Sequence, residues 1–315
     1  MTAGTIPKKT AATTQLPGRR ESRSFDRWAA LVEGWLRAHT ILVYVFLYLP
    51  IFVVVLFAFN DTNRRVTAWD GFSFKWFGVA LGDTVVQKAL LNSFLVAVPT
   101  AVLATMFGTM AALGLQRVGK KSRLFFDALT YTSIIVPEIV IALATLVLFA
   151  TGFDFIQSTF GIKLNFGHPT IIAAHVLFNI SLVLLLVRAR LSGMDRTLVE
   201  ASSDLFATPW RTFVQITFPM LLPAIVAGFL LSFTFSFDDY VITTFTSGPG
   251  SSTLPLFIFG QVKRGVTPET NAVATIILAF TIGMLLCAQM VLSWQNRRSG
   301  RKGGDMASLV AEQSG

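Results

Sequence analysis

The sequence predicts an all-α membrane protein with six transmembrane helices. Of its 315 residues, 53% are hydrophobic and only 14% are charged, whereas soluble domains carry about 25% charged residues. Six apolar runs approach or exceed the roughly 20 helical residues that a bilayer core requires. Basic residues also gather in alternate loops, as they do in membrane proteins of fixed orientation. Together these observations favour lipid as the solvent of most of the chain.

We place the six spans near residues 40–60, 89–114, 125–151, 170–190, 219–246 and 271–294. Helices are expected because a lipid-exposed backbone must satisfy its hydrogen bonds within the segment. The first run is longer than the hydrophobic stretch of a cleaved signal peptide, so we expect a retained span. The sequence shows no internal repeat, which weighs against transporters built from two detectable halves.

Charged loops predict the orientation of this six-helix domain, which we assign to residues 38–295. Basic residues precede span one and follow spans two, four and six, whereas the opposite loops are mixed in sign. The positive-inside rule therefore predicts that both termini are cytoplasmic. Residues 1–37 and 296–315 are rich in Thr, Ser, Gly and charge, and we expect flexible tails there. The basic positions outside the N-terminal tail are Arg117, Lys120, Lys121 and Arg123, then Arg188, Arg190, Arg196 and Arg211, and finally Arg297, Arg298, Arg301 and Lys302.

The net charge of +9 does not predict nucleic-acid binding, because the basic residues lie between apolar runs and not in one patch. The single cysteine, Cys287, lies in an apolar run, so no disulfide can form within the chain. We expect it to be a buried, inert thiol.

The cytoplasmic loop over residues 194–219 predicts a helix, a turn and a second helix. Apolar and small residues recur at helical spacing from Leu198 to Leu205. Thr208 and Pro209 are typical of an N-cap followed by proline at the first helical position. On pattern alone, an interfacial helix that merely covers the bundle explains this loop equally well.

This loop resembles the cytoplasmic loop of ABC importer permeases, which begins Glu-Ala-Ala, has Gly six positions after the Glu, and ends Ile-x-Leu-Pro. Four residues match in identity and spacing, Ser202 keeps the small size of the second Ala, and Phe218 replaces Leu. The resemblance implies a type I ABC importer permease fold, with the loop docked on a cytosolic ATPase. The residues it assigns to this coupling loop are Glu200, Ala201, Ser202, Phe206, Ile216 and Pro219.

Phe206 departs from the family pattern, because it stands where the family has Gly. Glycine there allows a positive φ, which a bulky side chain adopts only at a cost of roughly 1–2 kcal/mol. Either the turn has another geometry here, or the Phe206 ring makes a hydrophobic contact of its own.

Two further stretches extend the resemblance over roughly residues 40–295. Span two carries Asn92 and a run of small residues that ends at Gly108 and Ala111, and such residues let helices approach closely. The stretch from Ser236 to Thr275 resembles the second permease subunit of spermidine/putrescine importers. The residues of this stretch that resemble the importer subunit include its carboxylates, glycines and prolines. The resemblance implies a polyamine cargo.

The chemistry of the acidic residues agrees with such a cargo. Asp238 and Asp239 lie near the outer end of span five, and Glu138 in span three is expected at a neighbouring depth. Carboxylates beside aromatic rings such as Phe237 and Tyr240 suit a chain of ammonium groups. Adjacent helical residues point about 100° apart, so we expect only one Asp to face the path.

Structural roles are the alternative for these polar residues. Asp238 or Asp239 can cap a helix or pair with an Arg of a partner subunit. His175 in span four is more commonly a packed, hydrogen-bonded histidine than a ligand.

The sequence contains no nucleotide-binding Gly-x-x-x-x-Gly-Lys-Ser/Thr motif, so ATP and Mg²⁺ must be bound by another chain. It also shows no metal-ligand spacing and no nucleophile elbow, and we predict a transport subunit and not an enzyme. The resemblance implies a bacterial inner membrane and three kinds of partner. These are a second, different permease, two ATPase subunits and an extracytoplasmic polyamine-binding protein.

Three other interpretations stay open at this point. The nearest keeps the importer and changes the cargo to ferric iron, thiamine or another small solute. A secondary transporter driven by ion gradients would use the intramembrane acids as a relay but leaves the Glu200 loop unexplained. An intramembrane enzyme would need a catalytic pair within the bundle, and none is convincing.

Overall fold

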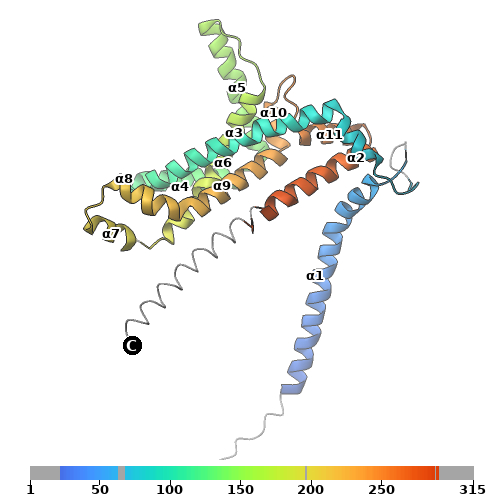
Figure 1. The fold of residues 1–315 in the computed structure, drawn as a ribbon, viewed down its shortest axis with the longest axis horizontal. Coiled ribbons are helices and arrows are strands. Elements are labelled where there is room, and N and C mark those ends of the chain that lie inside the picture. Colours follow the sequence, from blue (N-terminus) through green and yellow to red (C-terminus); the bar gives the residue numbers. More distant parts are fainter. Residues whose placement is uncertain (1–21, 63–67, 196, 288, 291–315) are drawn as a thin grey trace, which may run out of the picture. The chain divides into compact units, whose positions relative to one another are not determined.

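The computed structural model describes residues 22–62, 68–195, 197–287 and 289–290, and its named secondary-structure elements there are all helices (Figure 1). The chain forms two compact units, residues 1–53 and 54–315. The first unit contains most of helix α1 (Ser22–Ala58). Residues 22–37, expected within a flexible tail, are therefore helical. The remaining tail residues, 1–21 and 296–315, lie outside the described residues.

The helical start of α1 follows from its composition. Residues 28–38 combine Ala, Leu, Glu and Arg with Trp and Val, and most of these are good helix formers. Glu33 and Arg37 lie one turn apart, and the Arg37 guanidinium donates to the Glu33 carboxylate over 2.5 Å. Charged residues one helical turn apart support a helix, and composition alone does not distinguish such a helix from a flexible tail.

The predicted number of spans is confirmed within the described residues, where six helices are long and apolar enough to cross a membrane. Several predicted boundaries are wrong, above all at the first, third and fifth spans. The six helical segments are Leu31–Ala58, Thr84–Gly114, Glu138–Phe160, His168–Ser192, Pro209–Asp238 and Pro268–Cys287.

The centre of the second unit is a packed group of three helices, α3 (Thr84–Gly114), α6 (His168–Ser192) and α9 (Phe218–Asp238). They run side by side in Figure 1. A Cβ placed on Gly108 of α3 would lie 2.7 Å from Val183 Cβ of α6, and one on Gly228 of α9 would lie 3.2 Å from Val183 Cγ1. Val183 thus fills the space that two glycines leave, which is how small residues bring membrane helices together.

The third span is broken where we predicted a continuous helix over 125–151. Helix α4 (Lys120–Ile135) ends before Val136, whose ψ is 130°, and α5 (Glu138–Phe160) begins after Pro137. The Pro137 ring disfavours helical backbone at the preceding residue, which explains the break. As a result, Glu138 lies in the first turn of a new helix and not within a continuous one.

The fifth span is also broken where we predicted a continuous helix over 219–246. Helix α9 ends at Asp238, Asp239 is extended with ψ of 130°, and the short helix α10 (Val241–Thr246) follows. Because of this break, Asp238 lies in the last turn of α9 whereas Asp239 lies outside both helices.

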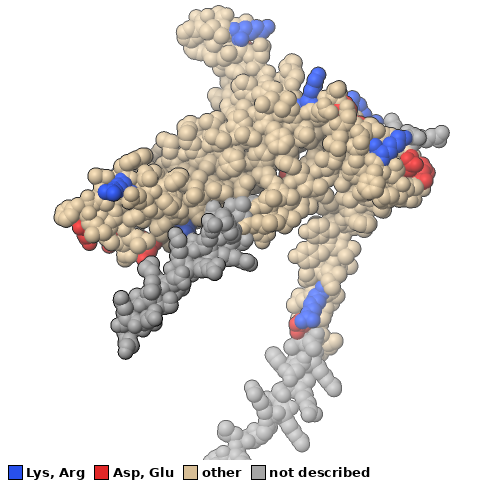
Figure 2. All heavy atoms as spheres, in the orientation of Figure 1, with Lys and Arg blue, Asp and Glu red and all other residues tan. Residues whose placement is uncertain are grey.

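Five short helices lie at the two ends of the three central helices. Helices α2 (Lys75–Gly82), α10 and α11 (Leu254–Arg264) lie at one end, and α7 (Thr197–Asp204) and α8 (Pro209–Thr212) at the other (Figure 1). In the same orientation, the visible face along the central helices carries few Lys, Arg, Asp or Glu, and these gather toward the helix ends (Figure 2). A charge-poor middle with charged ends is typical of a bundle that spans a membrane.

The end that carries α10 and α11 is tied to α3 by polar contacts. Asn92 Nδ2 donates to the carbonyl oxygens of Gly250 (3.0 Å) and Ser252 (2.9 Å), and Asn92 Oδ1 contacts His168 Nε2 (2.9 Å). Gly248 lies so close to the chain before α6 that a Cβ there would be 2.0 Å from the Phe166 carbonyl oxygen. The loop between α10 and α11 is therefore held tightly at this end.

Candidate functional site

The loop between α6 and α9 forms the predicted helix, turn and helix. Helix α7 is followed by a turn and by α8, and Thr208 Oγ1 accepts from the Arg211 N–H (3.4 Å) with Pro209 at the first helical position. At the start of α7, the Thr197 N–H donates to Asp195 Oδ1 (2.9 Å), and this bond lowers the pKa of the Asp195 carboxyl. The N-cap prediction for Thr208 and Pro209 is confirmed.

A buried hydroxyl pair joins the two helices of this loop. The Ser202 and Thr212 hydroxyl oxygens lie 2.7 Å apart, and both residues are buried. The chain then makes a π-helical turn over Phe213–Thr217 before α9 begins. The pair therefore links α7 to the start of the fifth span, so that the helices are connected through more than the turn.

The other predicted coupling residues lie on the outside of the loop. Glu200 and Ala201 are exposed on α7, Ile216 is half-buried in the π turn, and Pro219 is exposed in the first turn of α9. Glu200 also lines a cavity of about 670 Å³ with Arg117, Asp195 and Ser203. This cavity lies between the link that follows α3 and the coupling loop.

Phe206 adopts the conformation that glycine would favour. Its φ is 57°, and it is the one non-glycine residue with positive φ among those that the structure describes. Of the two alternatives for Phe206, another turn geometry is therefore wrong. Nor does the ring pack within this chain, because Phe206 is 95% exposed.

Asp239 is the centre of a buried polar network at the break between α9 and α10. Its Oδ2 accepts from the Thr243 N–H and hydroxyl (2.8 Å each), and its Oδ1 accepts from the Ile242 N–H (3.3 Å). Its carboxylate thus caps the first turn of α10. This geometry is the capping role that we considered as an alternative.

His175 of α6 completes this network. Its Nε2 lies 3.0 Å from Asp239 Oδ2, and its Nδ1 lies 2.7 Å from Ser236 Oγ. A carboxylate can only accept, so His175 Nε2 donates to Asp239. His175 is buried, with 1% of its surface exposed. The preference for a packed, hydrogen-bonded histidine is therefore confirmed.

The other acidic residues flank this network. Glu138, in the first turn of α5, is half-buried, and its carboxyl group neighbours that of Asp239. Asp238 is exposed at the last turn of α9 and is hydrogen-bonded to Thr281 of the helix Pro268–Cys287. The structure thus brings Glu138 and Asp239 together, whereas Asp238 turns to another helix.

The two aromatic candidates have different environments. Tyr240 is half-buried, and its ring lies 4.1 Å from that of Phe259 on α11, which Lys263 Nζ approaches to 4.8 Å. Phe237 is only 2% exposed and packs against the rings of Phe94 and Phe280. Phe237 is a core residue, so the expectation that it faces a cation is wrong.

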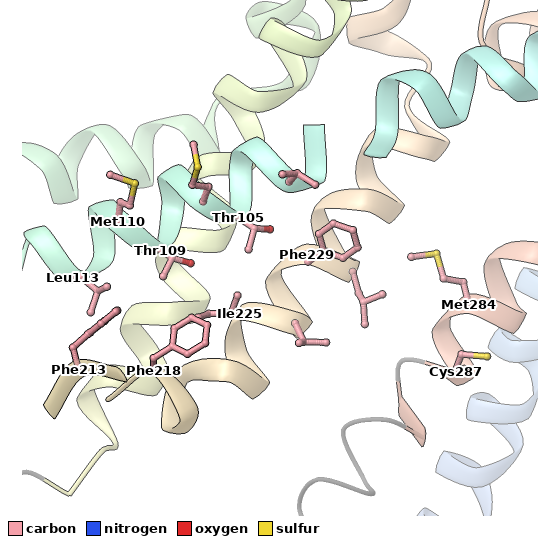
Figure 3. Close-up of a pocket in the computed structure, with 14 residues that line it drawn as sticks. Thr105, Thr109, Met110, Leu113, Phe213, Phe218, Ile225, Phe229, Met284 and Cys287 are labelled. Atoms are coloured by element: carbon pink, nitrogen blue, oxygen red, sulfur yellow. The ribbon is translucent and has the colours of Figure 1, made fainter. Parts of the chain in front are cut away.

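An apolar groove of about 780 Å³ runs between α3, α9 and the helix Pro268–Cys287 (Figure 3). Thr105 and Thr109 of α3 line it together with Phe229 of α9. Cys287 also lines this groove and is exposed, so the expectation of a buried thiol is wrong. Within the described residues, no group of three His, Cys, Asp or Glu side chains could hold a metal ion.

Several contacts of this site were not expected from the sequence. The Ser202–Thr212 pair joins residues ten positions apart, and Asn92 reaches residues about 160 positions away. The sequence offered one hint for the first, since a hydroxyl residue stands where the family has Ala. For the Asn92 contacts it offered only an amide inside an apolar run.

Comparison with known proteins gives the family. Residues 104–301 match the family described as the binding-protein-dependent transport system inner membrane component. The putrescine transport system permease protein PotI of Escherichia coli is 38% identical over 78% of this chain and 85% of its own length. The spermidine/putrescine transport system permease protein PotC of Haemophilus influenzae is 35% identical over 82% of this chain and 96% of its length.

Solved structures give the same fold at low sequence identity. A bacterial ABC transporter that imports the acidic polysaccharide alginate has a chain with a TM-score of 0.65 and 14% identity, covering 88% of this chain and 99% of its own. The methionine ABC transporter MetNI gives a TM-score of 0.51 at 14% identity, over 68% of this chain and 99% of its own. These likenesses concern the fold, whereas the family match covers more than half of the chain. The chain belongs to the inner membrane components of binding-protein-dependent transport systems, in which it is a permease subunit and not an ATPase.

Proposed function

We propose that this permease subunit forms part of the translocation path for polyamines, putrescine or spermidine, driven by ATP hydrolysis in separate ATPase subunits. The cargo assignment rests on relatives that are named as putrescine or spermidine permeases. They are 33–38% identical to this chain over about four fifths of its length. At such identity over nearly the whole membrane domain, the cargo class is the natural inference. The wider family transports other solutes, so the cargo is the part that needs a test.

The placement of the acidic residues supports a cationic cargo. Asp238 and Glu138 lie at the opposite end of the central helices from the coupling loop, about 30 Å away by the rise of the 21-residue α9. Asp238 is exposed on the surface of this chain, where a partner or cargo can reach it. An ammonium group that reaches Asp238 would meet a negative charge, which favours cations over neutral or acidic solutes.

The hydrogen bonds divide the roles of the two aspartates. The Asp239 carboxylate already accepts from two backbone N–H groups, the Thr243 hydroxyl and His175, so it has little capacity left for cargo. We assign Asp239 to holding the break between α9 and α10. Asp238, Glu138 and Tyr240 are then the cargo-facing candidates, with the Tyr240–Phe259 aromatic pair beside them.

Asp239 also supports a switching role for the break. A helix that ends and restarts within a membrane exposes backbone groups that must be satisfied locally, and Asp239 satisfies two of them. A carboxylate in this position can hold the outer end of the path in one arrangement while the α9 segment below it moves. Transport would then proceed by alternating access, with cargo delivered by an extracytoplasmic binding protein.

At the other end of the path, we propose that the coupling loop docks on an ATPase subunit. Its two helices are joined by the Ser202–Thr212 pair and continue through the π turn into α9. A movement of the loop is therefore transmitted to the fifth span. This assignment places the coupling loop and both termini in the cytoplasm. We further propose that a second, different permease completes the path and that two ATPase subunits bind on the cytoplasmic side.

The cargo is tested with the reconstituted complex of both permeases, two ATPases and the binding protein. Putrescine and spermidine should stimulate ATP hydrolysis, whereas thiamine and ferric citrate should leave the basal rate unchanged. Stimulation by thiamine or ferric citrate instead would overturn the polyamine assignment and leave the permease role intact.

The orientation is tested in intact cells. We would make the variants Arg117→Cys and Lys163→Cys, each in a Cys287→Ser background. Each is then treated with a thiol reagent that does not cross the membrane. The Lys163 position should react from outside and the Arg117 position only after permeabilisation. The reverse result contradicts cytoplasmic termini.

A further inference from the structure

Phe206 occupies a glycine position of the coupling-loop turn without changing its geometry. The Ala207 N–H donates to the Ser202 carbonyl (3.1 Å), and the Phe206 N–H donates to the Ser203 carbonyl (3.0 Å). These two bonds at the end of α7 form a Schellman motif, in which the residue at the Phe206 position is left-handed and usually glycine. The φ of 57° agrees with that motif. The turn thus keeps its glycine-type geometry although a bulky side chain opposes it.

A second unfavourable feature occurs at the same residue. The Phe206 ring is 95% exposed, and the preceding Leu205 is 81% exposed. Burying such side chains is favourable because it removes apolar surface from water, and this gain is not realised within the described residues of the chain. The backbone N–H of Phe206 helps to hold the turn, but its exposed ring adds no stability to the subunit through burial. The turn instead presents two adjacent apolar side chains outward.

The surroundings of these side chains argue against a lipid surface as the occupant. Asp195, Glu200 and Asp204 of this loop are exposed, and so is Arg211. This mixed charge lacks the cluster of basic residues that binds the negatively charged cytoplasmic leaflet. A protein surface with an apolar recess fits two adjacent exposed apolar side chains better. The chain lacks a nucleotide-binding motif and requires an ATPase partner, which is the protein expected at this loop.

We propose that Phe206, with Leu205, is an apolar anchor that inserts into a recess of the ATPase subunit, one with room for a phenyl ring. The anchor selects ATPases that carry such a recess over ATPases shaped for a glycine turn. This inference rests on the proposed docking of the coupling loop and adds the residue that determines affinity and partner choice. Residues that dominate interface energy fill well-packed pockets from which water is excluded, and a phenyl ring inserted into a recess would meet that condition.

The test uses substitutions that remove the ring but favour the turn. Glycine adopts positive φ without strain and asparagine tolerates it, so Phe206→Gly and Phe206→Asn keep the loop geometry. The affinity of the detergent-purified permease pair for the ATPase is measured by surface-immobilised binding. We expect both variants to weaken binding by about 10–30-fold, with the thermal midpoint of the permease unchanged or higher. Phe160→Ala, which removes an exposed ring from the far end of α5, should bind as the wild type does.

If Phe206→Gly and Phe206→Asn bind the ATPase with unchanged affinity, the proposal that Phe206 is an anchor is refuted. A cross-linking experiment distinguishes failure of the anchor proposal from failure of the proposal that the coupling loop docks on the ATPase. Glu200→Cys, in a Cys287→Ser background and carrying a photoactivated cross-linker, should attach to the ATPase in the assembled complex. Cross-linking with unchanged affinity refutes only the Phe206 anchor, whereas absence of the cross-link refutes docking of the loop and the anchor with it.

Discussion

His175 Nε2 lies 3.0 Å from Asp239 Oδ2, and this contact joins α6 to the break between α9 and α10. The neighbouring Asp238 has no part in it, although the two aspartates are adjacent in the sequence. Two identical side chains therefore have different roles, which mutation can separate.

Asp239→Ala should destabilise the assembled complex, whereas Asp238→Ala should not. Removal of the Asp239 carboxylate leaves buried donors on Ile242, Thr243 and His175 unsatisfied, at a cost of about 2–3 kcal/mol. We expect a thermal midpoint about 4–8 °C lower for Asp239→Ala, measured by intrinsic fluorescence in detergent. Equal midpoints for the two variants would be incompatible with the cap.

The same network predicts coupling between His175 and Asp239. His175→Ala alone removes one donor, and Asp239→Ala alone leaves His175 without its acceptor. The double variant should therefore cost less than the sum of the single variants, by about 0.5–3 kcal/mol. Strict additivity in a double-mutant cycle would show that the contact carries no energy.

Asp238→Asn should impair transport without affecting assembly. Loss of one exposed negative charge at the entrance weakens attraction of a polyammonium cargo, so KM for uptake should rise by about ten-fold, as for a charged contact of about 1.4 kcal/mol. Asp238→Glu keeps the charge and serves as the matched control. If KM is unchanged in Asp238→Asn, the residue does not face the cargo.

Gly108→Ala should weaken the contact between α3 and α6. The added Cβ would approach Val183 Cβ to 2.7 Å and the Ile180 carbonyl oxygen to 3.0 Å, so the helices must separate. Overpacking of this kind costs about 1–3 kcal/mol. Adding Val183→Ala should restore part of the thermal stability, and failure of this rescue would mean that the carbonyl contact, and not Val183, limits the approach.

Gly248→Ala should distort the loop between α10 and α11. A Cβ there would lie 2.0 Å from the Phe166 carbonyl oxygen, and a backbone atom cannot move aside as a flexible side chain can. We expect poor assembly, measured as the yield of complex on size-exclusion chromatography. Gly152→Ala, at a position with nothing within 4 Å of the added Cβ, is the control.

The six spans could be predicted from the sequence because hydropathy and length are local properties. The helix, turn and helix of the coupling loop were also predictable, since Thr208 and Pro209 form an N-cap whose signal lies within three residues. The breaks at Pro137 and Asp239 were missed because apolar runs continue on both sides of them, and mean hydropathy does not distinguish one helix from two. Pro137 carried the signal for the first break, but proline is tolerated within membrane helices, as Pro50 and Pro99 are here.

The candidate site was less predictable, since its contacts link distant parts of the chain. The sequence singled out Asp238, Asp239 and Glu138 as costly charges in an apolar context, but it could not say which carboxylate finds partners. Asp239 is satisfied because α6 places His175 beside it, and no local pattern encodes that pairing. The turn geometry at Phe206 depends on backbone bonds to Ser202 and Ser203, which override the preference of the side chain.

The most direct test of the account is ATP-dependent accumulation of labelled putrescine and spermidine in proteoliposomes that hold the complete complex and the binding protein. We predict accumulation that requires ATP, is lost in Glu200→Ala at the coupling loop, and needs higher cargo concentration in Asp238→Asn. Vigorous ATP hydrolysis with no accumulation of either polyamine would contradict the account.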